Sequence, residues 1–140
     1  MTVAILGMGP RGLSILERIC ALHTESAINE HMQIIIIDKN AMGVGAHSLS
    51  QPDHLLVNTV ACQITLFGDA TVKNTGPFRP GPCFHQWANN QGYRKVDDRY
   101  IKSETGRAID ANDYLPRRLL GEYLNWAYER ILKTVLCVPL

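Results

Sequence analysis

Three glycines cluster in the stretch "GMGPRG" near the start of the chain, at Gly7, Gly9 and Gly12. Glycine has no Cβ atom, so it permits a tight turn and a close approach by another molecule. Pro10 suits the first turn of a helix because its missing N–H would have had no partner there. The free N–H groups of a helix start, together with the positive end of the helix dipole, can hold phosphate groups. We therefore predict that these four residues and Arg11 bind a pyrophosphate.

Asp38 supplies the second chemical group that a dinucleotide site needs. Its carboxylate ends the apolar run "MQIIIID" and can accept hydrogen bonds from the hydroxyls of an adenosine ribose. Its separation from Gly12 exceeds the ~20 residues usual in such motifs, and the polar stretch "HTESAINEH" accommodates the excess as a helix end and loop. Lys39 follows directly, and Gly45 lets the next segment pass close to a bound cofactor. In the alternative interpretation, the glycines only shape a tight connection.

The elements that would position these residues are a strand, a helix and a second strand. Thr2–Gly7 carries consecutive apolar residues, which is typical of a strand covered on both faces. Apolar residues then recur at helical spacing from Leu13 to Cys20. Met32–Asp38 contains four consecutive isoleucines, which favour a second buried strand. The fold class predicted is α/β, a Rossmann-like βαβ dinucleotide-binding unit with a parallel sheet.

The rest of the chain predicts one long helix and less regular segments. Asp113–Leu136 has an apolar stripe at helical spacing and a cap at Asn112 or Asp113. "HLLVNTV" and "QITLF" are two candidate short strands, and "CFHQWANNQG" is a short helix ended by Gly92. Residues 74–82 form a rigid loop rich in proline and glycine, and residues 93–112 form a surface connection or flap. Arg117 and Arg118 bind phosphate or, in the alternative, are solvated.

Three stretches resemble a known family, the FAD and NAD(P)-binding flavoproteins. They are "VAILGMGPRGLSILERI", "PDHLLVNTVACQITLF" and "YLPRRLLGEYLNWAYERI", at residues 3–19, 52–67 and 114–131. More distantly, the chain resembles the flavin-dependent N-hydroxylating monooxygenases of lysine and ornithine. The resemblance implies FAD as the cofactor at Gly7–Gly12, and NADPH only with further sequence. It also implies that Asn58 and Gln63 contact the flavin or the substrate, against the alternative that they form loop hydrogen bonds.

The function that this resemblance implies is the FAD-binding portion of a flavin-dependent oxidoreductase. A more specific function that the resemblance implies is NADPH-dependent monooxygenation of an amine or amino acid. No catalytic residue can be assigned to it. The alternative is a non-catalytic remnant or an interaction module. Because only two convincing sheet strands are present, we expect residues 1–140 to be one FAD/NAD(P)-binding domain, the N-terminal part of a longer flavoprotein. Its open sheet edges predict self-association or a complementary subunit, and its substrate would be a small molecule.

Composition argues against several other classes. The 14 basic and 13 acidic residues nearly cancel and form no run of like charge, so neither nucleic acid nor a membrane surface is an expected partner. No signal peptide or membrane span is recognised, which predicts a cytoplasmic protein. The four cysteines are widely spaced and are expected to be reduced and mostly buried, with no metal site. They are Cys20, Cys62, Cys83 and Cys137.

Overall fold

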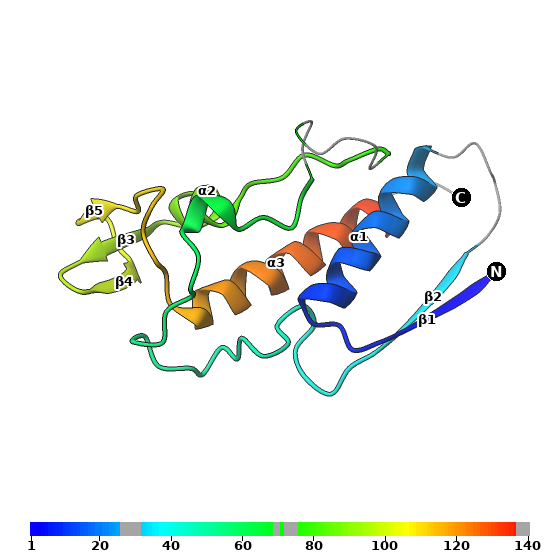
Figure 1. Cartoon of the computed structure of the whole chain (residues 1–140), viewed down its shortest axis with the longest axis horizontal. Helices are drawn as coiled ribbons and strands as arrows, with labels where there is room; N and C mark the ends of the chain where they lie inside the picture. The colour runs from blue at the N-terminus through cyan, green and yellow to red at the C-terminus, as the bar shows by residue number, and fades with distance from the viewer. Residues whose placement is uncertain (26–31, 69–70, 72–75, 137–140) are drawn as a thin grey trace.

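The computed structural model describes residues 1–25, 32–68, 71 and 76–136. Within these residues, β1 (Thr2–Leu6) and β2 (Gln33–Ile37) lie at one end of the molecule, and a small antiparallel sheet lies at the other (Figure 1). The helices α1 (Pro10–Glu25) and α3 (Arg117–Leu136) pack against each other between the two sheets. Most of the polar loop predicted after α1 lies outside the described residues. Cys137 lies outside them as well.

The predicted βαβ unit is confirmed. β1 and β2 pair in parallel, with Thr2 opposite Gln33 and Leu6 opposite Ile37, and α1 begins at Pro10 as the proline and the helical spacing predict. On one face of this sheet, Ile5 belongs to the core, and three residues pack against that core. These three are Val3, Ile34 and Ile36.

The other face of the parallel sheet is open, so the prediction that both faces are covered is wrong for the described residues. Leu6, Ile35 and Ile37 are 78%, 42% and 56% exposed. Side chains alternate between the two faces of a strand, and the register places these three on the same face. Both faces of the sheet therefore carry apolar side chains, yet among the described residues only one face contacts the helical layer.

The two strands predicted in residues 54–67 are not formed. This segment instead contains an isolated bridge between Leu56 and Pro116, followed by the 3₁₀ turn η1 (Ala61–Gln63). Its backbone N–H groups at positions 57, 61 and 62 donate to carbonyls at positions 115, 113 and 111. These bonds lie at irregular intervals along the chain, whereas a regular antiparallel ladder engages alternate residues. Apolar composition alone therefore did not make a strand here.

Residues 84–108 contain one confirmed helix and one sheet that the sequence did not predict. Helix α2 (Phe84–Asn90) ends just before Gly92, which has a φ of 80°. The predicted surface connection is instead a sheet of β3 (Tyr93–Val96), β4 (Arg99–Lys102) and β5 (Arg107–Ala108), in the order β4-β3-β5. Charged residues mask its pattern, but Tyr93 and Tyr100 are buried and anchor it.

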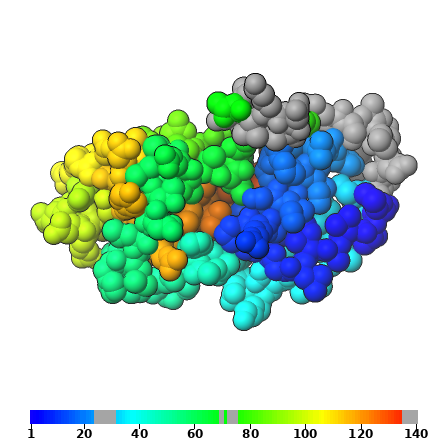
Figure 2. All heavy atoms as spheres, in the orientation of Figure 1, coloured from blue at the N-terminus to red at the C-terminus, as the bar shows by residue number. Residues whose placement is uncertain are grey.

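Helix α3 begins at Arg117, later than the Asp113 predicted. The carboxylate of Asp113 accepts the N–H of Asp110 at 2.8 Å and forms an ion pair with Arg107 at 2.8 Å. Asp113 therefore holds the preceding turn and β5 and does not cap the helix. Figure 2 shows α3, in orange, largely covered by the N-terminal and middle segments on this face of the molecule.

An aromatic cluster forms the centre of the C-terminal core. Tyr123 contacts the rings of Phe84 and Trp87, with ring centres 5.5 and 5.6 Å apart. Trp126 stacks on Tyr123 at 6.1 Å, so this tryptophan packs against the core. Among the cysteines described, only Cys20 is buried, so the expectation that most are buried is not met.

Candidate functional site

The glycine turn between β1 and α1 is shaped by two of its three glycines. Gly7 has a φ of 88°, which favours glycine, and its N–H donates to the carbonyl of Ile37 at 2.8 Å. A Cβ atom at Gly12 would lie 2.2 Å from the carbonyl oxygen of Gly7. Gly12 therefore lets α1 pack directly against the end of β1.

Three backbone amides at the start of α1 are free. The N–H groups of Gly9, Arg11 and Gly12 have no hydrogen-bond partner among the described residues, and the first bond of the helix runs from Leu13 N–H to Gly9 oxygen at 2.9 Å. No acidic residue lies in the first turn of α1. Free donors at the positive end of a helix dipole form an anion-binding site, so this turn fits a pyrophosphate.

Asp38 lies against the glycine turn and also holds it in place. One carboxylate oxygen accepts the N–H of Met8 at 2.6 Å, and the other accepts the N–H of Asn40 at 2.8 Å. These bonds, that from Asn40 first, hold the pKa of Asp38 below its ordinary value, so the group is an anion at neutral pH. Each oxygen keeps a second lone pair for a further donor. The sequence pointed to the ribose role but did not reveal the bond to Met8.

A second loop closes on the glycine turn. The N–H of Gly43 donates to the carbonyl of Met8 at 2.7 Å, and a Cβ at Gly45 would lie 2.8 Å from Pro10 Cδ. Gly45 has a φ of 55°. A Cβ at Gly9 would in turn lie 3.3 Å from Gly45 Cα. Gly45 thus lies directly against the glycine turn, and the absence of a side chain at Gly9 permits this close packing. The predicted approach of Gly45 to a bound cofactor stays a prediction.

This loop is also fixed against α3 by contacts that the sequence did not suggest. A Cβ at Gly43 would lie 2.5 Å from the carbonyl oxygen of Leu124, and one at Gly121 would lie 2.0 Å from that of His47. The side chain of Asn125 donates to the carbonyl of Met42 at 2.9 Å. In the sequence, only the glycines indicated a close contact at this place. Their partners are backbone groups far apart in sequence, which residue type does not reveal.

The remaining predicted site residues lie at the surface. Arg11 and Lys39 are exposed, one within the turn and one beside Asp38. Asn58 and Gln63 are also exposed, and neither side chain bonds to the glycine turn within the described ranges. Within the described part of the chain, the carboxamide oxygen of Asn58 accepts one hydrogen bond, from the neighbouring hydroxyl of Thr59 at 3.5 Å.

The two adjacent arginines of α3 have different environments. Arg118 pairs with Asp53 and with Glu122, the latter at 3.0 Å, and Glu122 also accepts the hydroxyl of Tyr93. The Arg118 hydrogen bond lowers the pKa of Asp53, while burial and then Glu122 raise the pKa of Tyr93. Arg118 also donates to the carbonyl of Tyr100 at 3.3 Å, so it joins α3 to the antiparallel sheet. Arg117 is exposed and forms no ion pair with any described residue.

The part of the chain that the structure describes contains no group of three or more His, Cys, Asp or Glu residues placed to hold a metal ion. It also contains no helix long and apolar enough to cross a membrane. The partly buried His47 has a lowered pKa, first because of burial and then because of Arg117.

Similarity to known proteins extends over almost the whole chain. It is 41% identical over 132 residues to an L-aspartate N-monooxygenase (nitrosuccinate-forming) of Streptomyces davaonensis, covering 92% of this chain and 20% of that protein. A protein of the same name from Streptomyces cremeus is 35% identical over 139 residues, with 94% and 21% covered. A nitrosuccinic acid synthase of Aspergillus oryzae is 33% identical over 133 residues, with 94% and 18% covered. The chain thus spans about a fifth of the length of these relatives.

A family model gives the broader assignment. Residues 4–137 match the family described as FAD-NAD(P)-binding. The match contains the glycine turn, Asp38 and the whole of α3 as described, and it agrees with the resemblance noted in the sequence. The chain therefore belongs to the FAD-NAD(P)-binding family.

Proposed function

We propose that this chain is the FAD-binding part of a flavin-dependent oxidoreductase that oxygenates the amino group of a small amino acid. The observation that carries the proposal is the set of three free amides at the start of α1, beside the carboxylate of Asp38. The names of the relatives support the substrate class, since two are L-aspartate N-monooxygenases. Residues 1–140 would act as one cofactor-binding domain of a longer flavoprotein, with the NADPH site formed by other residues.

In this proposal the chain binds and orients the cofactor. The amides of Gly9, Arg11 and Gly12 would donate to the pyrophosphate, and the remaining lone pairs of Asp38 would accept from ribose hydroxyls. The positive side chains of Arg11 and Lys39 would add attraction for the phosphates. Bound FAD would supply the electron-transfer and oxygen chemistry, which the cofactor carries in such enzymes. Asn58 and Gln63 stay candidates for contacts on the flavin or substrate side.

The test is a titration of the purified chain with FAD, followed by the absorption and fluorescence of the flavin. We expect Gly9→Val to abolish binding, because a Cβ there lies 3.3 Å from Gly45 Cα, and the larger side chain would push the turn away from this loop and displace its amides. Gly68→Val is the matched control, since a Cβ there meets Phe78 at an ordinary 3.6 Å. Circular dichroism checks that both variants fold. Equal affinity of Gly9→Val and the parent chain for FAD would refute the assignment.

An interaction module without catalysis is the second candidate, and the open face of the parallel sheet favours it. Leu6, Ile35 and Ile37 form a contiguous apolar surface there, and such surfaces mark association sites. This candidate predicts that the folded chain fails to bind FAD but self-associates or captures a complementary subunit. Sedimentation at several concentrations, run beside the FAD titration, distinguishes the two candidates.

A further inference from the structure

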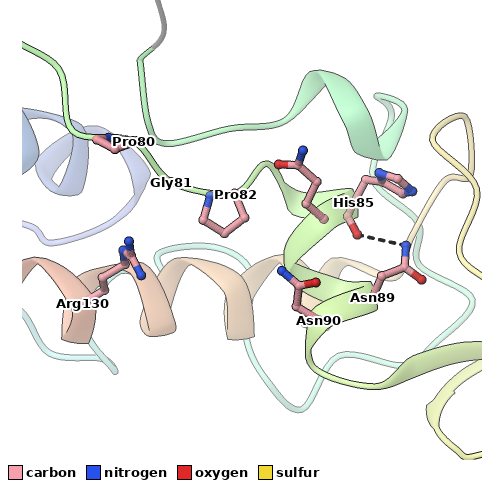
Figure 3. A pocket seen from close by; sticks show the side chains of 8 residues that line it. Pro80, Gly81, Pro82, His85, Asn89, Asn90 and Arg130 are labelled. Carbon is pink, nitrogen blue, oxygen red and sulfur yellow. Dashed lines mark hydrogen bonds between the residues drawn. The ribbon is translucent and has the colours of Figure 1, made fainter.

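A pocket of about 650 Å³, open to solvent over most of its extent, lies between α2, the loop at residues 80–82 and α3 (Figure 3). Arg130 enters it from α3, and Asn90 borders it from α2. Two proline rings, those of Pro80 and Pro82, supply apolar surface in the same wall. The pocket thus combines one positive charge and polar amides with apolar rings.

Arg130 is an exposed side chain of α3 that lies beside two aromatic rings. Its guanidinium lies 5.5 Å from the ring centre of Trp126 and 6.0 Å from that of Phe67. Among the described residues it forms no ion pair. A cation beside aromatic rings is attracted by them, and the guanidinium can still offer its N–H groups to an oxyanion in a two-pronged arrangement.

The walls of the pocket are fixed by contacts of their own. A Cβ at Gly81 would lie 2.3 Å from the ring of Phe67, so this loop rests on the same ring that Arg130 covers. The hydroxyl of Tyr123 donates to the carbonyl of Pro82 at 2.9 Å. These contacts fix the loop before any ligand arrives.

Some side-chain amide groups of α2 form hydrogen bonds within the described ranges, and others do not. The carboxamide oxygen of Gln86 accepts the N–H of Cys83 at 3.0 Å, which leaves its NH₂ group unbonded within the described ranges. The side chain of Asn90 likewise makes no hydrogen bond there, whereas that of Asn89 bonds to Ile109. The unused donors of the pocket are therefore Arg130, Asn90 and the NH₂ of Gln86.

The pocket and the loop that closes on the glycine turn lie on opposite faces of α3. Successive residues of a helix are about 100° apart, which places Arg130 about 180° from Gly121. Gly121 and Leu124 contact the loop that closes on the glycine turn, whereas Arg130 lines the pocket. A ligand in the pocket is thus separated from the glycine turn by the thickness of the helix.

We propose that this pocket is a second ligand site, which binds a small molecule through a carboxylate or phosphate group held by Arg130. The proposal goes beyond the FAD-binding function and does not depend on it. Asn90 and the Gln86 amide would donate to the same oxyanion or to a neighbouring polar group, and the prolines would contact the carbon skeleton.

The experiment uses the intrinsic fluorescence of the full chain, whose tryptophans are Trp87 and Trp126. An anion at Arg130 changes the charge near the ring of Trp126, so we expect a saturable change on titration with succinate or inorganic phosphate at constant ionic strength. The stronger of the two titrations identifies the preferred oxyanion. Uncharged succinamide, as a control, should give no change.

Two variants separate the site from general attraction of anions. Arg130→Gln should weaken binding at least tenfold, as judged by fluorescence and by the rise in melting temperature at saturating anion. Lys133→Gln removes the same charge from an exposed position outside the pocket and should bind as the parent chain does. Equal weakening in both variants, or no saturable change in the parent chain, would overturn the proposal. FAD affinity should be unchanged in Arg130→Gln, so the two proposals fail independently.

Discussion

The two ends of the molecule cover their apolar surface in different ways. At the antiparallel end, Phe84 and Tyr123 are fully buried within the aromatic cluster. At the parallel end, the sheet contacts α1 and the core with one face only, and Leu6 and Ile37 are more than half exposed. The glycine turn belongs to the end that is less well covered. In the proposed function, cofactor binding and stability therefore depend on different parts of this chain.

This difference follows from what each end uses to form its structure. The glycine turn is set by backbone contacts that side chains would prevent, such as the close approach of Gly12 to Gly7. The opposite end relies on large rings in contact, and buried aromatic side chains contribute the most apolar area to a core. Loss of a ring should therefore unfold the chain, whereas an added methyl group at the turn should act first on ligand binding.

The largest effect is expected from Phe84→Ala. Phe84 is fully buried and its ring contacts Trp87 and Tyr123. We expect its removal to lower the free energy of unfolding by about 3–5 kcal/mol, the usual cost of a large aromatic cavity. Urea denaturation followed by circular dichroism measures this. Phe78→Ala, at an exposed phenylalanine, should cost far less, and equal losses would show that the aromatic cluster is not the main source of stability.

Gly12→Ala should have an intermediate effect on stability and a large one on binding. The new Cβ would lie 2.2 Å from a backbone oxygen that no rotamer change can move. We expect α1 to shift away from β1, at a cost of about 1–3 kcal/mol, with FAD binding lost. Denaturation and FAD titration measure the two effects separately. A variant that binds FAD as tightly as the parent chain would show that the contact between helix and strand does not set the turn.

The sequence allowed the parallel end to be predicted better than the antiparallel end. The βαβ unit is local, since its signals lie within "VAILGMGPRG" and "MQIIIID", and it formed as expected. The strands β3 to β5 went unrecognised because their two anchoring tyrosines are separated by charged residues and their stability comes from contact with α2 and α3. Local composition does not encode such pairings.

The candidate site shows the same limit. Gly7, Gly12 and Asp38 were predictable from residue type and spacing, and the structure brings them together. The bond from Met8 to Asp38 was not predictable, because any residue at position 8 would offer the same N–H. The pocket at Arg130 joins three segments and left no motif in the sequence.

Asp38→Asn should act locally and test how the turn is held. The variant keeps one acceptor oxygen, so it can keep the bond from Met8 or that from Asn40 but not both. We expect FAD binding to weaken by roughly tenfold, with little change in global stability. Asp98→Asn, at an exposed acid, is the control.

The pH dependence of the same contact gives an independent measure. The pKa of folded Asp38 is lowered, so its stabilising effect is present above the usual aspartate pKa of about 3.9 and is lost as the pH falls through the lower folded value. The amide signal of Met8 in NMR spectra should follow this titration in the parent chain and not in Asp38→Asn. If the Met8 signal of the parent chain does not change with pH, the hydrogen bond from Met8 to Asp38 is contradicted.

The smallest change in stability is expected from Leu6→Ser on the open face of the parallel sheet. Leu6 is 78% exposed, so the substitution removes little buried area and should change the free energy of unfolding by less than about 0.5 kcal/mol. Because Leu6 lies opposite Ile37 on that face, the variant should nonetheless bind the dye ANS less and sediment with less self-association than the parent chain. Val3→Ser, on the packed face of the same strand, is the matched control and should be clearly more destabilising. A large loss of stability in Leu6→Ser would mean that this face is covered in solution, and the contrast between the two ends of the molecule would then not hold.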